Sequence, residues 1–204
     1  MSHRHVPERR RLRQLGDGTK AYASLSDRIT VIDVKSQTVT SMIDLPDVGR
    51  VALSPDGWRG YASSYSANQV NVLDLATNQI VDRIPVGSEP GGVAMTPDGR
   101  QAYVANAKSG DVSVIDPASD RVVATLPVIT QPNDRAWGVQ VAPDGRYAYV
   151  RLDSEIVAID TSTNTVAGRV KAGVFPTGMA ITVDGTKAYV SHHSDSVMTV
   201  LGSG

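Results

Sequence analysis

The chain has 204 residues, a formal net charge of −1 and no cysteine. This length suits one domain with a sizeable core, and the lack of cysteine excludes disulfides and thiolate metal sites. No apolar run reaches the roughly 18 residues that a membrane-spanning helix needs, and the balanced charge gives no general attraction to nucleic acid. We therefore expect neither a membrane span nor a nucleic-acid partner.

The first residues of the chain differ from the rest in charge. Residues 1–20 carry six basic and two acidic side chains, although the whole chain is almost balanced. The basic cluster in residues 1–16 is either an arm for an acidic partner or, as we favour, a solvated terminus. No apolar segment follows it, so these residues are not a secretory signal peptide. The compartment stays open: cytoplasmic if this N-terminus is native, exported if a signal peptide was removed.

A repeat of about 40 residues organises the sequence from residue 17 onward. Asp-Gly pairs, which suit tight turns because Gly accepts positive φ, recur at spacings of 39, 42, 46 and 40 residues. Each aspartate of these pairs is followed five positions later by a tyrosine. These tyrosines are Tyr22, Tyr61, Tyr103, Tyr149 and Tyr189. The period, with four short strand patterns per unit, predicts the blades of a β-propeller.

The third unit, residues 91–128, shows the pattern most clearly. Turns rich in Pro, Asp, Ser and Gly separate its apolar or β-branched runs, which lie at 92–96, 101–106, 111–116 and 121–126. The third run of each unit is nearly all apolar, so stacking the blades would bury both of its faces. One tyrosine per blade would be buried as well, and its hydroxyl group needs a partner. We interpret the aspartates that end the third runs as caps of the next turn: Asp33, Asp74, Asp116 and Asp160.

The segment Tyr103-Val-Ala-Asn106 carries a resemblance to a known family. With Gly87, Pro90 and Gly92 before it and Asp111–Asp116 after it, it resembles the YVTN-type β-propeller repeat. The resemblance covers nearly all of residues 17–201 and is specific for the fold rather than for a function. It implies blades of four strands, although the family often has seven blades and this chain is too short for seven. The asparagine of the motif occurs once, at Asn106, and different residues replace it elsewhere: Leu25, Ser64, Leu152 and His192.

We therefore predict an all-β fold, a single β-propeller of about five four-stranded antiparallel blades. Within a repeat region of 17–204, the blades are expected at about 12–45, 50–86, 91–128, 138–170 and 177–201. The last blade has only three strand patterns. Residues 1–16 are expected to supply its closing strand, because Val6-Pro7 lies in the register of an outer strand. A fragment of a larger propeller, completed by a second chain, is the alternative, and the oligomeric state is left open.

Strand direction sorts the loops onto two faces of such a propeller. The Asp-Gly turns and the turns after the third strands share one uniform face. The connections between blades share the other face with the loops between second and third strands, and we call it the loop face. Its connection 129–137 is four residues longer than the counterpart 87–91. Because function concentrates in irregular loops on a regular scaffold, we expect ligand-binding residues here: Trp137, Arg135, Tyr65, Asn106 and Phe175. Trp137 is either an exposed ligand contact or a plug over the channel.

The loop face also carries the candidates for catalysis. His192 or His193 would act as acid or base near neutral pH, with Asp153 or Glu155 as the partner. Adjacent histidines on a strand point to opposite sides, so we predict no metal site. The sequence has no phosphate loop or dinucleotide fingerprint, so no cofactor is predicted.

Two functions stay open. The first is a binding or scaffolding propeller that presents the loop face to a protein, peptide, glycan or small-molecule ligand. The second is a small propeller enzyme with its site at the channel mouth; lyases, lactonases and cyclases occur among propellers that resemble this family. The fold alone does not decide between them, because propellers host both. We favour binding, since it needs only an exposed aromatic and polar patch.

Overall fold

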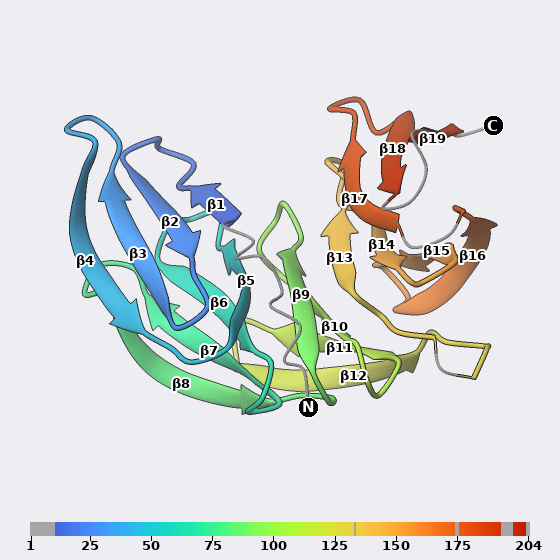
Figure 1. Ribbon diagram of the computed structural model, residues 1–204, viewed down its shortest axis with the longest axis horizontal. Coiled ribbons are helices and arrows are strands. Elements are labelled where there is room, and N and C mark those ends of the chain that lie inside the picture. The colour runs from blue at the N-terminus through green and yellow to red at the C-terminus, as the bar shows by residue number, and fades with distance from the viewer. Residues whose placement is uncertain (1–10, 133, 174–175, 193–197, 203–204) are drawn as a thin grey trace, which may run out of the picture.

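The structure is a computed structural model that describes residues 11–132, 134–173, 176–192 and 198–202. These residues form 19 β-strands. The strands make five antiparallel sheets that follow one another along an arc (Figure 1). The predicted fold class, an all-β propeller of five blades, is confirmed. The described part of the chain contains no helix that could cross a membrane.

Each sheet is a meander in which strands that follow one another in the sequence are paired. The first sheet consists of β1 (Arg11–Gln14), β2 (Lys20–Ser24), β3 (Arg28–Asp33) and β4 (Thr38–Asp44). The second consists of β5 (Val48–Leu53), β6 (Arg59–Ser64), β7 (Gln69–Asp74) and β8 (Gln79–Pro85). The third consists of β9 (Pro90–Met95), β10 (Ala102–Asn106), β11 (Asp111–Asp116) and β12 (Arg121–Pro127). The fourth consists of β13 (Gly138–Val141), β14 (Tyr147–Arg151), β15 (Glu155–Asp160) and β16 (Thr165–Lys171).

The fifth sheet has three strands in the described residues, where the prediction has four. It consists of β17 (Pro176–Ile181), β18 (Lys187–His192) and β19 (Met198–Gly202). Residues 1–10 lie outside the described residues, so closure of the ring by the N-terminus stays a prediction. Residues 11–14 form β1, which pairs with β2 as the inner strand of the first sheet.

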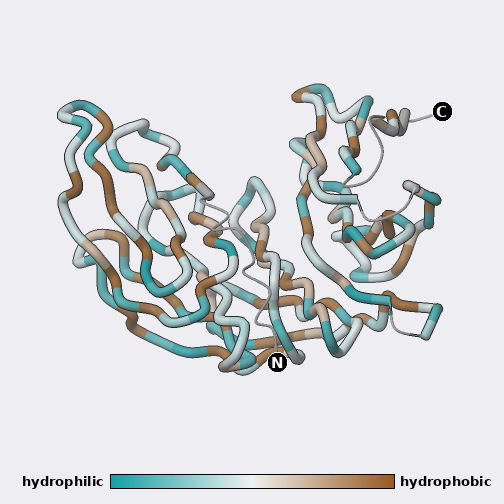
Figure 2. The backbone as a smooth tube through the Cα atoms, viewed as in Figure 1, coloured by the Kyte–Doolittle hydropathy of each residue, from teal (hydrophilic) through white to brown (hydrophobic). Residues whose placement is uncertain are grey.

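The second and third strands of the sheets form the core. β10 is buried along its whole length and β11 is buried except at its two ends, whereas the outer strand β12 has no buried residue. Figure 2 shows the apolar segments along the strands and the polar segments at the turns. Because the third strands are apolar on both sides, stacking one sheet on the next buries both faces, as predicted.

Three of the repeated tyrosines connect neighbouring sheets. Their side chains have no exposed surface, and each hydroxyl group donates to a residue in the turn between the third and fourth strands of the next sheet. The three acceptor residues all have φ between 52° and 56°. The same contact therefore recurs at three successive sheet interfaces. The pairs are Tyr22 with Asn78 Oδ1 (3.2 Å), Tyr61 with Asp120 Oδ1 (2.9 Å) and Tyr103 with Asn164 Oδ1 (2.6 Å).

The aspartates that end the third strands cap the turns that follow, as predicted. Asp74 Oδ1 accepts hydrogen bonds from the backbone N–H groups of Ala76 (3.0 Å) and Thr77 (2.7 Å). The equivalent aspartates accept the corresponding backbone bonds in their own sheets: Asp33, Asp116 and Asp160. Because each carboxyl group recurs once per sheet with the same local partners, these aspartates serve the fold and are not a catalytic pair.

The repeated aspartates lead to a prediction for acid stability. Turn hydrogen bonds lower the pKa of eight of them: Asp17, Asp33, Asp56, Asp74, Asp98, Asp116, Asp160 and Asp184. A carboxyl group with a depressed folded-state pKa contributes stability above its unfolded pKa of about 3.9, and the contribution is lost as the pH falls through the folded value. We expect the melting temperature to stay level down to about pH 5 and to fall below about pH 4. Thermal melts from pH 7 to pH 2 measure this, and an unchanged melting temperature at the acid end would contradict it.

Candidate functional site

Five residues of the loop face form a connected group, which we call the loop-face cluster. They come from the second, third and fourth sheets. The loop after β6 supplies one, the connection before β9 another, the long connection before β13 two, and the loop between β14 and β15 the last. The cluster is Tyr65, Glu89, Arg135, Trp137 and Asp153. Residues up to 88 positions apart in the sequence are thus brought to one place by the stacking of the sheets.

Glu89 lies at the centre of the cluster. Its Oε2 accepts a hydrogen bond from Arg135 Nη1 at 3.0 Å and another from the hydroxyl group of Tyr65. Lys108 Nζ lies 3.7 Å from the other carboxylate oxygen. The Tyr65 hydrogen bond and the two nearby cations lower the pKa of Glu89, while burial and the Glu89 carboxylate raise the pKa of Tyr65. Glu89 is therefore ionised and Tyr65 protonated at neutral pH.

Arg135 and Trp137 form the exposed part of the cluster. The Arg135 guanidinium lies over the indole ring, with Cζ 5.3 Å from the ring centroid, a favourable cation–π geometry. Asp153 holds both residues: Oδ1 accepts from Trp137 Nε1 at 2.6 Å, and Oδ2 accepts from the Arg135 backbone N–H at 3.1 Å. The Trp137 side chain is still 37% exposed. The arrangement is a fixed aromatic and cationic platform that solvent reaches.

The backbone around the cluster explains why these side chains meet. Glu89 has a φ of 55°, and its N–H donates to Asn68 Oδ1 at 2.9 Å. Asp47, at the equivalent place in the preceding connection, has a φ of 53°, so this conformation belongs to the repeat. Trp137 donates its backbone N–H to Arg151 O at 3.0 Å, directly before β13 begins. The repeat therefore determines the backbone conformation of these connections. The side chains of the two connections, which differ from one repeat to the next, form the contacts of the loop-face cluster.

The residues proposed for catalysis have separate partners. Asp153 belongs to the loop-face cluster, while Glu155 accepts from Arg169 Nη1 at 2.7 Å. His192 Nε2 is 2.9 Å from Thr199 Oγ1, on the neighbouring strand β19. His193 lies outside the described residues. Among the described residues, no hydrogen bond joins His192 to Asp153 or to Glu155.

The residues predicted to bind a ligand have different positions. Tyr65, Arg135 and Trp137 are brought together in the cluster. Asn106 is fully buried instead: its Nδ2 donates to Asp111 Oδ1 at 2.6 Å and to Ser113 Oγ at 2.9 Å, inside the β10–β11 hairpin. Its side chain therefore lies below the loops, inside this hairpin. Phe175 lies outside the described residues.

Glu89, at the centre of the cluster, is not among the ligand-binding candidates that the sequence indicates. Its sequence context, a single acidic residue before Pro90 in a connection between blades, places it on the loop face. Its central place in the cluster depends on contacts with Tyr65 and Arg135, which lie 24 and 46 positions away in the sequence. A local pattern has no means of indicating these partners.

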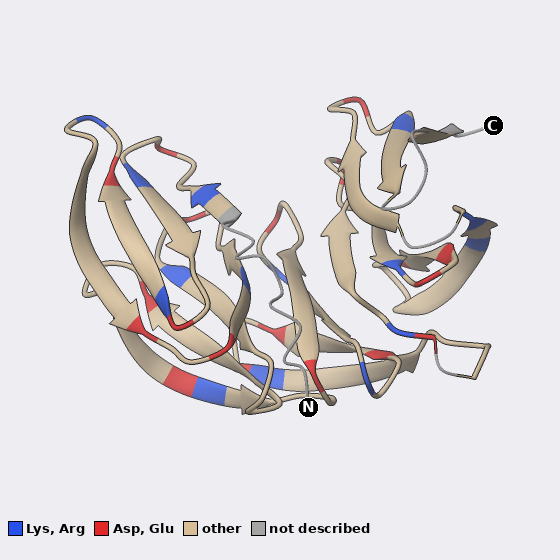
Figure 3. Ribbon diagram, in the orientation of Figure 1, with Lys and Arg blue, Asp and Glu red and all other residues tan. Residues whose placement is uncertain are grey.

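Acidic and basic residues are interspersed over the sheets, with many acidic residues at the turns (Figure 3). Within the described ranges, no group of three or more His, Asp and Glu side chains is placed to hold a metal ion. No Gly-rich phosphate loop is present in the sequence either. The polar groups of the loop-face cluster bind one another, and the Trp137 side chain stays partly exposed.

Comparison with known proteins supports the fold. No protein-family model and no curated protein matches the chain. Among solved structures, Kuenenia stuttgartiensis hydrazine synthase matches with a TM-score of 0.84 and 22% identity, over 100% of this chain and 66% of that one. The Cps50 (Swd1) β-propeller domain of Myceliophteria thermophila matches with a TM-score of 0.77 and 14% identity, over 93% of this chain and 63% of that one. The chain is a β-propeller that spans about two thirds of the length of each of these neighbours.

Proposed function

We propose that the chain is a binding propeller, built from repeats that resemble the YVTN type, which presents its loop face to a protein, peptide or glycan ligand. The observation that carries the proposal is the Arg135–Trp137 platform. Its two side chains are held by Asp153 and Glu89, and the indole ring remains 37% exposed. Arg and Trp are the residue types that most often anchor an interface. Side chains already fixed in one conformation lose little entropy when a ligand binds.

The arrangement of the carboxylates favours binding over catalysis. Acid–base catalysis needs a titratable group within hydrogen-bond reach of a second reacting group. Here Glu89 is neutralised by Arg135 and Lys108, Asp153 holds Trp137, and Glu155 is paired with Arg169. These carboxylates already accept hydrogen bonds that position other side chains. Their role in the proposed function is to orient the platform.

The test uses peptide and glycan arrays probed with the labelled protein, followed by titration of the strongest peptide or glycan. Trp137→Ala and Arg135→Ala should each weaken its binding at least about tenfold, or about 1.4 kcal/mol, since each removes half of the platform. The protein offers matched controls. Trp58 is 67% exposed beside an Asp-Gly turn on the other face, and Arg121 is exposed on the outer strand β12.

Trp58→Ala and Arg121→Ala should bind the same ligand as tightly as the unmodified protein does. A loss of affinity in these controls, with none in Trp137→Ala and Arg135→Ala, would show that the ligand does not bind to the loop face. No binding to any peptide or glycan would contradict the proposed function itself.

A further inference from the structure

The fifth sheet, at one end of the arc, leaves one of its faces exposed. In the first three sheets, the face that carries the repeated tyrosine packs against the next sheet, and we call it the tyrosine face. In the fifth sheet, Tyr189 is 37% exposed, Met198 59% and Val200 53%. Tyr189 pairs with Val200, and Met198 lies two residues before Val200 in β19. The three side chains therefore share the tyrosine face of this sheet.

The equivalent residues of the earlier sheets have no exposed surface. Strand pairing identifies the counterparts of Met198 and Val200 in the third strands of the first three sheets. All of these counterparts are fully buried: Ile29, Val31, Val70, Val72, Val112 and Val114. The fifth sheet therefore keeps the apolar residues of a sheet interface, although no further sheet of the described residues follows it.

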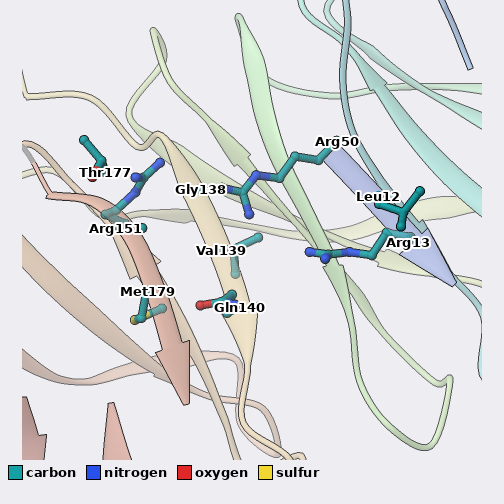
Figure 4. A pocket seen from close by; sticks show the side chains of 10 residues that line it. Leu12, Arg13, Arg50, Gly138, Val139, Gln140, Arg151, Thr177 and Met179 are labelled. Atoms are coloured by element: carbon teal, nitrogen blue, oxygen red, sulfur yellow. The ribbon is translucent and has the colours of Figure 1, made fainter. Parts of the chain in front are cut away.

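The first sheet, at the other end of the arc, is exposed on the opposite face. Leu12 is 58% exposed, and Figure 4 shows it on the inner strand β1, beside the cavity that the inner strands line. The valines at the same paired position in the next three sheets are at most 3% exposed: Val51, Val93 and Val139. Gln37 of the first sheet has a φ of 57°, close to that of the turn residues that accept the tyrosine hydroxyl groups in the later sheets. The first sheet thus carries the acceptor half of the interface whose donor half is the tyrosine face.

A sector of the ring separates these two exposed faces. Figure 1 shows the first and fifth sheets at the two ends of an open arc. The chain covers 63% of the Swd1 β-propeller domain with a TM-score of 0.77, so the arc has the curvature of a longer propeller. The remaining sector, about a third of such a ring, corresponds to about two blades at a period of about 40 residues. A second copy of this chain, joined head to tail, would bring five sheets into this sector and collide with the first sheet.

We propose that this sector is a docking site for a second chain that supplies two propeller blades. The first of these blades covers Tyr189, Met198 and Val200 with apolar side chains, and an Asn, Asp or Gln in its turn accepts a hydrogen bond from the Tyr189 hydroxyl group. The second blade presents a tyrosine face of its own to Leu12 and donates to Gln37. Each contact repeats an interface that the chain already forms between its own sheets, and removal of apolar surface from water drives the association. The sector is separate from the loop-face cluster, and neither proposal depends on the other.

The chain itself provides a probe with this chemistry, because residues 46–128 hold the second and third sheets. Asn78 of the probe accepts from Tyr189, as it does from the tyrosine of the first sheet. Tyr103 of the probe donates to Gln37, as it does to the turn of the fourth sheet.

The experiment joins this probe to the C-terminus of the full chain through a flexible linker that contains a protease site. The linker is cleaved after purification, and the products are separated by size-exclusion chromatography with light scattering. We expect the cleaved probe to elute together with the chain as a one-to-one complex. A probe that elutes separately, or that aggregates, would overturn the proposal.

Variants of the fifth sheet locate the docking surface. Tyr189→Asp and Val200→Asp place a charge in an apolar interface, so each should lower the co-eluting fraction of the probe at least about tenfold. Val183→Asp is the matched control, because Val183 is 93% exposed in the Asp-Gly turn of the same sheet. This control should leave co-elution unchanged. Loss of the probe in Val183→Asp, with none in Tyr189→Asp and Val200→Asp, would show that the probe is held elsewhere.

Other occupants of the tyrosine face give different results. Co-elution that begins only after deletion of residues 1–10 would show that the N-terminal segment of the chain covers this face. A dimer of the unextended chain that Tyr189→Asp dissociates would show that a second copy covers it. Either result would overturn the assignment of the sector to blades from a second chain.

Discussion

Replacing Tyr103 by alanine is expected to lower the free energy of unfolding by about 3–5 kcal/mol, the range for truncating a buried aromatic side chain. The ring is fully buried among residues of the third and fourth sheets, so its loss leaves a cavity at their interface. The substitution also removes the hydrogen bond from the hydroxyl group to Asn164 Oδ1. Urea unfolding, followed by circular dichroism, measures the change.

Two further variants separate the causes of this loss. Tyr103→Phe keeps the ring and removes only the hydroxyl group, so it should cost about 1 kcal/mol. Tyr189, the equivalent residue of the fifth sheet, is 37% exposed, so Tyr189→Ala should cost clearly less than Tyr103→Ala. An equal loss at the two positions would show that the repeated tyrosines do not stabilise the protein through the sheet interfaces.

Replacing Gly92 by alanine is expected to lower the free energy of unfolding by about 3 kcal/mol, at the upper end for an overpacked site. A Cβ atom on Gly92 would lie 2.6 Å from Gly138 Cα and 2.9 Å from Val139 N. These are backbone atoms of β13, which has no flexible side chain to move aside there. The alanine would therefore force the inner strands β9 and β13 apart.

Gly168→Ala is the matched control. Gly168 lies in the outer strand β16, its φ is outside the left-handed region, and nothing lies within 4 Å of a Cβ at this position. This substitution should change the free energy of unfolding by no more than about 0.5 kcal/mol, as is usual for open surface sites. If the two glycine variants unfold at the same urea concentration, the close approach of the inner strands is not a source of stability.

Much of the fold is predictable from the sequence because its signals are local. An Asp-Gly pair specifies a turn through the φ of Gly, and the aspartates ending the third strands cap their own turns within three residues. Repetition of these signals at a period of about 40 residues then indicates a propeller. The register shift between the third and fourth strands, at Val114/Ile115 and its equivalents in three other sheets, is not predictable in this way. The register shift arises from the way two strands pair. No particular residue type marks its position in the sequence.

The candidate site was predictable only in part. The long connection 129–137 indicates that Arg135 and Trp137 belong to the working face, since strand direction decides where a connection lies. Which partners they meet depends on how sheets stack. Glu89 is the clearest example, because its partners come from other sheets. Asn106 is the opposite case: it was expected to contact a ligand, but the polar side chains of its own hairpin bind its amide nitrogen.

The most direct test of the loop face as the binding surface is hydrogen–deuterium exchange of the protein with and without the peptide or glycan that binds most tightly on the arrays. We predict that the ligand slows exchange in residues 86–91, 134–138 and 152–155, which form or flank the loop-face cluster. Exchange in the Asp-Gly turns at 56–57, 98–99 and 144–145 should not change. Protection confined to those turns, with unchanged exchange around Glu89 and Trp137, would contradict the account.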